Sequence, residues 1–282
     1  MYPITMTKII AICNQKGGVG KTTTAVNLSA FFALADKKTL LLDMDPQGNA
    51  TSGIGIDKTT VQQTIYHALL ERVDISELVR DTQLNNLSIV PSNLNLTGAE
   101  VELVGAIGRE FKLKNILTPI VNKFELIVID CPPSLGLLTV NALTACQTVL
   151  IPIQCEYYAL EGLGQLTQTL DLVRRNLNPS LELEGVLLTM ADYRTKLTTE
   201  VIDEARAYFK EKVYNTVIPR NIKLTEAPSY GKPIALYDMN SIGAQTYQQL
   251  ANEILKIETR QHIENKEVIP ENVIEQETAK GE

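Results

Sequence analysis

A glycine-rich segment near the beginning of the chain combines the residue types that bind phosphates. Residues 14–24 read NQKGGVGKTTT. Glycines let the backbone curve around an anion with its N–H groups directed inward, and a helix that begins near Lys21 would add the positive end of its dipole. Lys21 would reach the β- and γ-phosphates of a nucleotide, and the Thr22 hydroxyl would ligate Mg²⁺. The predicted nucleotide contacts are Lys16, Gly17, Gly18, Val19, Gly20, Lys21, Thr22 and Thr23.

This loop departs from the pattern G-x-x-x-x-G-K-[ST] at its first position. Gln15 stands where the first glycine would fall, and Lys16 follows it. A second lysine inside the loop marks a deviant Walker A sequence. The alternative is a glycine-rich turn that binds nothing, but the strand predicted before it and the helix predicted after it favour a phosphate-binding loop.

Carboxylates follow two further apolar runs. Asp43 and Asp45 close the run at 39–45, and the alternation of a strand places both on one side of it. Asp45 is the better candidate to orient an attacking water, because proteins mainly position groups and balance charge in phosphoryl transfer. A structural role is the alternative for Asp45 and the expected role of Asp43. Asp130 follows four apolar residues, as in a Walker B motif, and is predicted to hold Mg²⁺ directly or through water.

The elements that must position these groups are short apolar runs separated by longer amphipathic stretches. The runs cover residues 8–14, 39–45, 87–92, 126–132, 148–154, 183–190 and 213–219. Continuous Val, Ile and Leu are typical of strands that are covered on both faces. The sequence therefore predicts an α/β fold with a doubly wound, mainly parallel sheet and helices on both faces. Ligands of such sheets bind beyond the carboxyl ends of the strands, where the candidate residues fall.

Length and charge suggest one domain followed by a tail. The chain has 282 residues, of which 44% are hydrophobic, and we assign residues 1–257 to a single domain. Residues 258–282 contain seven acidic and three basic residues, and so carry −4 of the net charge of −7. This acidic tail is predicted to be disordered. No apolar stretch has the length of a signal peptide or a membrane span, so we expect a cytoplasmic protein.

Five segments of the chain carry a family resemblance: NQKGGVGKTTT, LLDMDPQGNATSG, IVIDCPPSLGLLTVNAL, IPIQCEYYALEGL and IPRNIKLTEAPSYGKPI. They resemble the ParA family, and specifically the chromosomal Soj-type proteins that segregate replication origins. The similarity extends from about residue 6 to residue 257. It implies an ATPase that uses ATP and Mg²⁺ and forms a nucleotide sandwich dimer.

The resemblance also implies roles for individual residues. Lys16 would reach across the dimer to the phosphates of the partner and act in catalysis with Lys21, and Asp45 would be needed for hydrolysis. Pro219 and Asn221 would lie beside the nucleotide base.

The resemblance further implies that the ATP dimer binds double-stranded DNA without sequence preference, through basic residues on one face. The matching positions are Arg194 and Lys223, and Lys196 and Lys232 are additional candidates. Without the resemblance, each would be read as a solvated surface cation. A ParB-like centromere-binding protein would stimulate hydrolysis, the replication initiator DnaA is a second candidate partner, and the protein would associate with the nucleoid.

Three other classes of protein share this type of loop. A MinD-like membrane ATPase would end in a basic amphipathic helix, whereas this chain ends in an acidic segment. An iron–sulfur carrier would need suitably spaced cysteines, and Cys13, Cys131, Cys146 and Cys155 form no C-x-x-C pair. A metabolic synthetase would need a substrate pocket, for which the sequence gives no sign. We therefore expect a partitioning ATPase that does not act on membranes.

Overall fold

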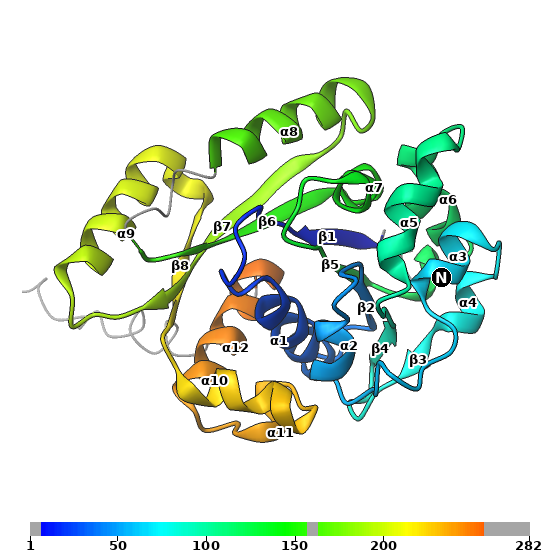
Figure 1. Cartoon of the computed structure of the whole chain (residues 1–282). Coiled ribbons are helices and arrows are strands. Elements are labelled where there is room, and N and C mark those ends of the chain that lie inside the picture. The colour runs from blue at the N-terminus through cyan, green and yellow to red at the C-terminus, as the bar shows by residue number, and fades with distance from the viewer. Residues whose placement is uncertain (1–6, 157–162, 257–282) are drawn as a thin grey trace, which may run out of the picture.

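The computed structural model describes residues 7–156 and 163–256. The predicted end of the domain at residue 257 and the predicted acidic tail, 258–282, lie outside these ranges. The described residues form a sheet with the strand order β3-β4-β2-β5-β1-β6-β7-β8 (Figure 1). The strands are β1 (Lys8–Ile12), β2 (Thr39–Asp43), β3 (Arg80–Asp81), β4 (Leu87–Val90), β5 (Leu126–Asp130), β6 (Thr148–Gln154), β7 (Glu182–Ala191) and β8 (Val213–Pro219).

Helices connect the strands. The α-helices are α1 (Lys21–Leu34), α2 (Asn49–Gly53), α3 (Ile65–Leu70), α4 (Ile75–Leu78), α5 (Leu96–Glu102), α6 (Lys112–Leu117), α7 (Leu137–Ala145), α8 (Leu163–Asn176), α9 (Lys196–Phe209), α10 (Ile222–Glu226), α11 (Ile234–Tyr237) and α12 (Ile242–Leu255). Short 3₁₀ helices are η1 (Leu103–Gly105), η2 (Arg109–Phe111), η3 (Val121–Lys123), η4 (Lys210–Lys212) and η5 (Ala227–Tyr230).

The sheet is covered on both faces, as the continuous apolar strands require. Ile10 and Ile12 of β1 point into a core formed with α1, α2, α10, α11 and α12. Ala11 of β1 and Cys13 just beyond it point into the opposite core, formed with helices α3 to α9. Figure 1 shows the same division, with α7 and α8 on one side of the sheet and α1 and α12 on the other. The arrangement is a three-layer α/β fold.

The observed fold confirms the predicted fold class, and each of the seven apolar runs forms a strand. The prediction missed β3, which comprises only Arg80 and Asp81, both exposed, and pairs antiparallel with β4. A two-residue exposed strand has no apolar run, so no pattern in the sequence marks it. The other strand pairs are parallel.

Parallel pairing brings the candidate residues to one edge of the sheet. In the register of the central strands, Ile12 lies opposite Asp130, and Asp130 lies opposite Asp43. The carboxyl ends of β1, β5 and β2 are therefore neighbours. The glycine-rich loop after β1 and the two aspartate motifs, which are far apart in the sequence, meet there.

Candidate nucleotide-binding site

The loop between β1 and α1 has the backbone conformation that its glycines permit. Gly18 and Gly20 have φ angles of 75° and 88°, in the left-handed region that other residues rarely occupy. Gly20 is the N-cap of α1, so the helix begins directly at Lys21. A Cβ atom built on Gly17 or Gly18 would meet nothing within 4 Å. The loop is thus open to solvent along its glycines, at the N-terminal end of a helix dipole.

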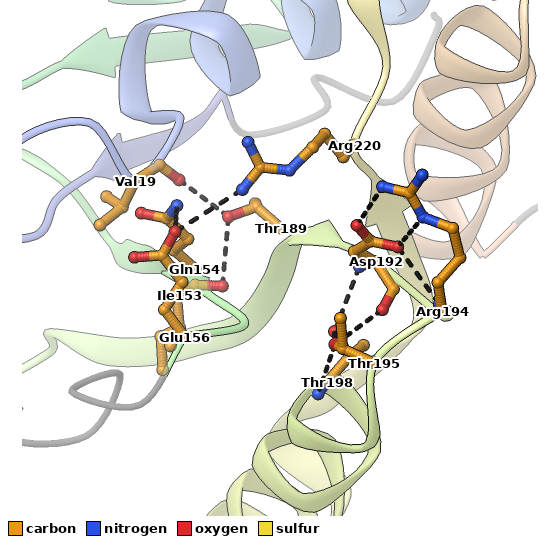
Figure 2. Close-up of polar contacts among 10 residues, drawn as sticks. All are labelled: Val19, Ile153, Gln154, Glu156, Thr189, Asp192, Arg194, Thr195, Thr198 and Arg220. Atoms are coloured by element: carbon orange, nitrogen blue, oxygen red, sulfur yellow. Dashed lines mark hydrogen bonds and ion pairs between the residues drawn. The ribbon is translucent and has the colours of Figure 1, made fainter.

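Polar contacts from neighbouring strands hold this loop in place. The Asn14 side chain donates to the Pro152 carbonyl of β6 at 2.7 Å and accepts from the Lys16 N–H at 3.0 Å. The Thr189 hydroxyl of β7 lies 2.9 Å from the Val19 carbonyl and 3.1 Å from the Ile153 carbonyl (Figure 2). Asn14 opens the loop segment and Thr189 lies on β7, and neither was among the predicted nucleotide contacts. They are positioning residues that only the folded chain reveals.

Lys21 is largely buried inside the loop. Its side chain donates to the main-chain carbonyl of Lys16 at 2.9 Å, and only 7% of the residue is exposed. Burial lowers the pKa of the Lys21 ammonium, and the nearby carboxylates of Asp130 and Asp45 oppose that shift. A buried ammonium whose hydrogen bond, within the described residues, goes to a neutral carbonyl is well suited to bind an anionic phosphate.

Asp130 is fully buried, and neither carboxylate oxygen has a hydrogen-bond partner of ordinary geometry in the described part of the chain. Burial and the neighbouring Asp43 raise its pKa well above the usual range, while the Thr22 hydroxyl and Lys21 act in the opposite direction. Two unpartnered buried oxygens next to a threonine hydroxyl match the oxygen donors that Mg²⁺ prefers, directly or through its waters. Thr22 and Asp130 therefore fit a magnesium ion.

The other two aspartates have different environments. Asp43 is fully buried and accepts from the Asp45 N–H at 3.1 Å and from the N–H and hydroxyl of Thr51 at 2.8 and 2.7 Å. Burial raises the pKa of Asp43 to about 6 despite these bonds. The Thr51 hydroxyl in turn accepts from the Ser92 N–H at 2.9 Å, and the Ser92 hydroxyl donates to the Asp45 carbonyl at 2.8 Å. Asp43, Thr51 and Ser92 thus fix the backbone that carries Asp45.

The Asp45 carboxylate follows the end of β2, two residues beyond Asp43, which is paired with Asp130 of β5. One oxygen accepts from the Gln47 N–H at 2.9 Å, and the residue is 6% exposed. Its negative charge raises the pKa values of both Lys21 and Asp130. The structure therefore brings Lys21, Asp45 and Asp130 together at one end of the sheet.

A cavity of about 380 Å³ adjoins the loop. It is lined by Gly20, Thr23, Thr189, Met190, Ile218, Pro219, Arg220, Asn221, Leu224, Thr225, Pro228 and Tyr247. Asn221 is also the N-cap of α10, where its side-chain oxygen accepts from the Leu224 N–H at 3.3 Å. A cavity of this size and mixed lining, beside a phosphate-binding loop, is suited to a nucleoside.

The four cations predicted to contact DNA follow the two neighbouring strands β7 and β8, whose ends are paired through Ala191 and Pro219. All four residues, Arg194, Lys196, Lys223 and Lys232, are exposed. Two of them form ion pairs with nearby acids, Arg194 with Asp192 at 2.6 Å and Lys223 with Glu226 at 3.0 Å. These pairs could not be read from the sequence.

A glycine-rich loop closed by a lysine, a Walker B aspartate and a nucleoside-sized cavity define the class of P-loop ATPases with a deviant Walker A motif. Residues 7–183 match a protein-family model described as an AAA domain. The chain is 56% identical over 255 residues to the chromosome partitioning protein ParA of Myxococcus xanthus, with 90% of each chain covered. It is 57% identical over 249 residues to the sporulation initiation inhibitor protein Soj of Bacillus subtilis, covering 88% of this chain and 98% of that one.

The chain belongs to the ParA/Soj family, and it is an ATPase whose cofactors are ATP and Mg²⁺. Among solved structures, a crystal structure of cobyrinic acid a,c-diamide synthase from Mycobacterium smegmatis with bound ADP and magnesium has a TM-score of 0.79 and 35% identity. That match covers 89% of this chain and 95% of the other. The shared fold extends over almost all of the described residues.

Proposed function

We propose that this protein is a DNA-partitioning switch driven by ATP. The Mg·ATP form makes a sandwich dimer, the dimer binds double-stranded DNA without sequence preference, and slow hydrolysis releases it. One observation carries the proposal beyond ATP hydrolysis. Met190, the last residue but one of β7, and Pro219, the last residue of β8, line the nucleotide cavity, and the same chain segments continue directly to Arg194 and Lys223. A change at the nucleotide therefore has a short path to the DNA-binding surface.

The positions of the side chains support the proposed catalytic roles. Lys21 would bind the β- and γ-phosphates, and Thr22 and Asp130 would hold the magnesium ion, which would supply positive charge to balance that of the phosphates. Asp45 lies close to these groups and orients the attacking water. Pro219 and Asn221, in the wall of the cavity, contact the base.

Lys16 acts across the dimer. It is partly exposed on the open side of the loop, next to the exposed Gly17 and Gly18, where a second copy of the chain can approach. A cation supplied by that copy would stabilise the charge that develops during phosphoryl transfer. This arrangement makes hydrolysis depend on dimerisation.

The DNA-bound dimer is proposed to act on the nucleoid in the cytoplasm. Phosphate attraction needs only positive charge, which Arg194, Lys196, Lys223 and Lys232 supply on the exposed surface. A ParB-like protein stimulates hydrolysis, and DnaA is a second proposed partner. Within residues 7–156 and 163–256, none of the helices has the length and apolar character needed to cross a membrane.

A metabolic synthetase remains the second candidate function, because the solved structure with 35% identity carries the name of one. The partitioning proteins of Myxococcus xanthus and Bacillus subtilis are 56% and 57% identical, which favours partitioning. A synthetase would turn over ATP only with its acid substrate, whereas a partitioning switch would respond to DNA and a ParB-like protein.

The deciding experiment measures binding of the protein to random-sequence duplex DNA with ATP, with ADP and without nucleotide, at two salt concentrations. Binding that appears only with ATP and weakens steeply with salt supports the switch, because phosphate contacts release counterions. ATP binding without any DNA binding would leave the ATPase intact and remove the partitioning function.

A further inference from the structure

The guanidinium of Arg194 is already occupied by an internal carboxylate. Its Nε donates to Asp192 Oδ1 at 2.8 Å and its Nη2 donates to Asp192 Oδ2 at 2.6 Å, so two parallel hydrogen bonds join the groups (Figure 2). This is the geometry with which arginine binds two oxygens of a phosphate. The Arg194 side chain is 86% exposed, and its position is therefore set by Asp192 and not by packing.

The main chain of Asp192 is held by hydrogen bonds to Thr195 and Thr198. The Asp192 N–H donates to the Thr198 hydroxyl at 3.2 Å, and its carbonyl accepts from the N–H and the hydroxyl of Thr195, both at 3.0 Å. Thr195 is the N-cap of α9. The carboxylate is only 24% exposed, and its hydrogen bonds with Arg194 lower the pKa of Asp192 to about 2, so it is ionised at neutral pH.

Asp192 also adjoins the nucleotide cavity. It follows Ala191, whose carbonyl accepts from the Arg220 N–H at 3.0 Å. Arg220 lines the cavity and its guanidinium reaches toward Glu156, 3.6 Å away (Figure 2). The contact that occupies Arg194 is thus built onto the wall of the ATP site.

We infer that Asp192 is an internal phosphate mimic that masks Arg194, so that DNA must displace this carboxylate in order to bind. The inference rests on the proposed DNA-binding function. Each DNA phosphate that takes the guanidinium leaves the Asp192 charge unpaired and close to the anionic DNA backbone, which opposes binding. Asp192 therefore limits the affinity of the protein for DNA and keeps the complex easy to release.

The second matching cation is masked in the same way. Lys223 donates to Glu226 Oε2 at 3.0 Å, and the Tyr237 hydroxyl donates to the same oxygen at 2.9 Å and holds it. Lys196 and Lys232 have no acidic partner within 4.0 Å among residues 7–156 and 163–256. The acids Asp192 and Glu226 thus pair with the two cations, Arg194 and Lys223, that match the DNA-binding positions of the family.

The test compares Asp192→Asn with the wild type in binding to random-sequence duplex DNA in the presence of ATP. Asparagine keeps the shape of the side chain and removes its charge. An exposed ion pair is a weak competitor for the guanidinium, and a dimer contains the pair twice, so we expect about 2- to 30-fold tighter binding and a steeper dependence on salt. Asp171→Asn is the matched control, because it removes the acid from an exposed pair with Arg174 on α8. It should leave DNA affinity unchanged.

Unchanged or weaker binding by Asp192→Asn would overturn the inference, and weaker binding would indicate that Asp192 orients Arg194 for DNA. A gain that persists when Arg194 is replaced by alanine would overturn it as well, since the carboxylate would then act on DNA without Arg194. These results leave the proposed function in place as long as the wild type binds DNA with ATP. If neither protein binds DNA, both the inference and the proposed function fail.

Discussion

The ammonium of Lys21 donates a hydrogen bond to the main-chain carbonyl of Lys16, 2.9 Å away, across the glycine-rich loop. The lysine that would bind phosphate thus reaches back to the residue that would act on the partner subunit. The side chain of Lys21 and the main chain of Lys16 are therefore joined directly across the loop.

Replacing Lys21 with alanine should weaken ATP binding about 10- to 100-fold. Hydrogen bonds to charged groups contribute about 1.5–3 kcal/mol, and the bond from the Lys21 ammonium to the phosphates would be lost without a substitute. Titration with a fluorescent ATP analogue measures the effect. Lys37→Ala is the control, because its ammonium pairs with Glu125 far from the loop. Equal ATP affinity of the two variants would contradict the role of Lys21.

Lys16→Ala should still bind ATP but fail to hydrolyse it. A cation supplied in trans contributes about 10³-fold or more to phosphoryl transfer in related reactions, and a lysine on the open side of the loop is placed to supply one. ATP turnover and the mass of the ATP-bound form, measured on the same sample, separate binding from dimerisation. Full turnover by a monomeric variant would remove Lys16 from the mechanism.

Asp45→Ala should trap the ATP-bound dimer on DNA. Loss of the group that orients the attacking water should slow hydrolysis about 10²-fold or more, while Lys21, Thr22 and Asp130 still hold the nucleotide. Ser92→Ala, which removes only the 2.8 Å bond to the Asp45 carbonyl, should give a smaller fall. Single-turnover hydrolysis and release from DNA are the measurements. Rapid turnover by Asp45→Ala would leave the residue a structural role alone.

The nucleotide-free protein should lose stability as the pH rises from about 4 to about 6. Burial raises the pKa of Asp43 from 3.8 to about 6, so the folded chain binds a proton more tightly than the unfolded chain. The stabilisation is complete below the unfolded pKa and is lost as the pH passes the folded one, on the order of 3 kcal/mol from Asp43 alone.

Urea unfolding at several pH values measures this dependence. Asp130→Asn is the informative comparison, since it removes a second buried carboxyl group with a raised pKa and part of the charge repulsion on Asp43. It should flatten the pH dependence and abolish the added stability that Mg·ATP gives the wild type. Parallel curves for the two proteins would show that these buried acids do not control the pH dependence.

Replacing Arg194 and Lys223 together with alanine should weaken DNA binding and leave ATP affinity nearly intact. Each lost phosphate contact should lower the slope of log affinity against log salt by about 0.9, counted over both subunits of the dimer. Arg174→Ala with Lys37→Ala is the matched control, because it also removes two exposed, paired cations. The same DNA affinity in both double variants would mean that the DNA-binding surface lies elsewhere.

Much of this protein could be predicted from its sequence because the signals are local. Seven strands follow from continuous apolar runs, and the phosphate-binding loop follows from glycines and a lysine within eleven consecutive residues, 14–24. The strand β3 could not be predicted, because two exposed residues gain their conformation only from pairing with β4.

The sequence by itself determined the fold class, the family and the chemistry of the loop, since backbone conformation and burial depend on short stretches of residue types. Only the tertiary structure decided which side chains fix the positions of the loop and of the proposed functional residues. Asn14 and Thr189 tie the loop to β6 and β7, Ser92 supports Asp45, and Asp192 occupies Arg194. Hydrogen bonds and ion pairs depend on distances of about 3 Å, and most of these form between residues that come together only when the sheet assembles.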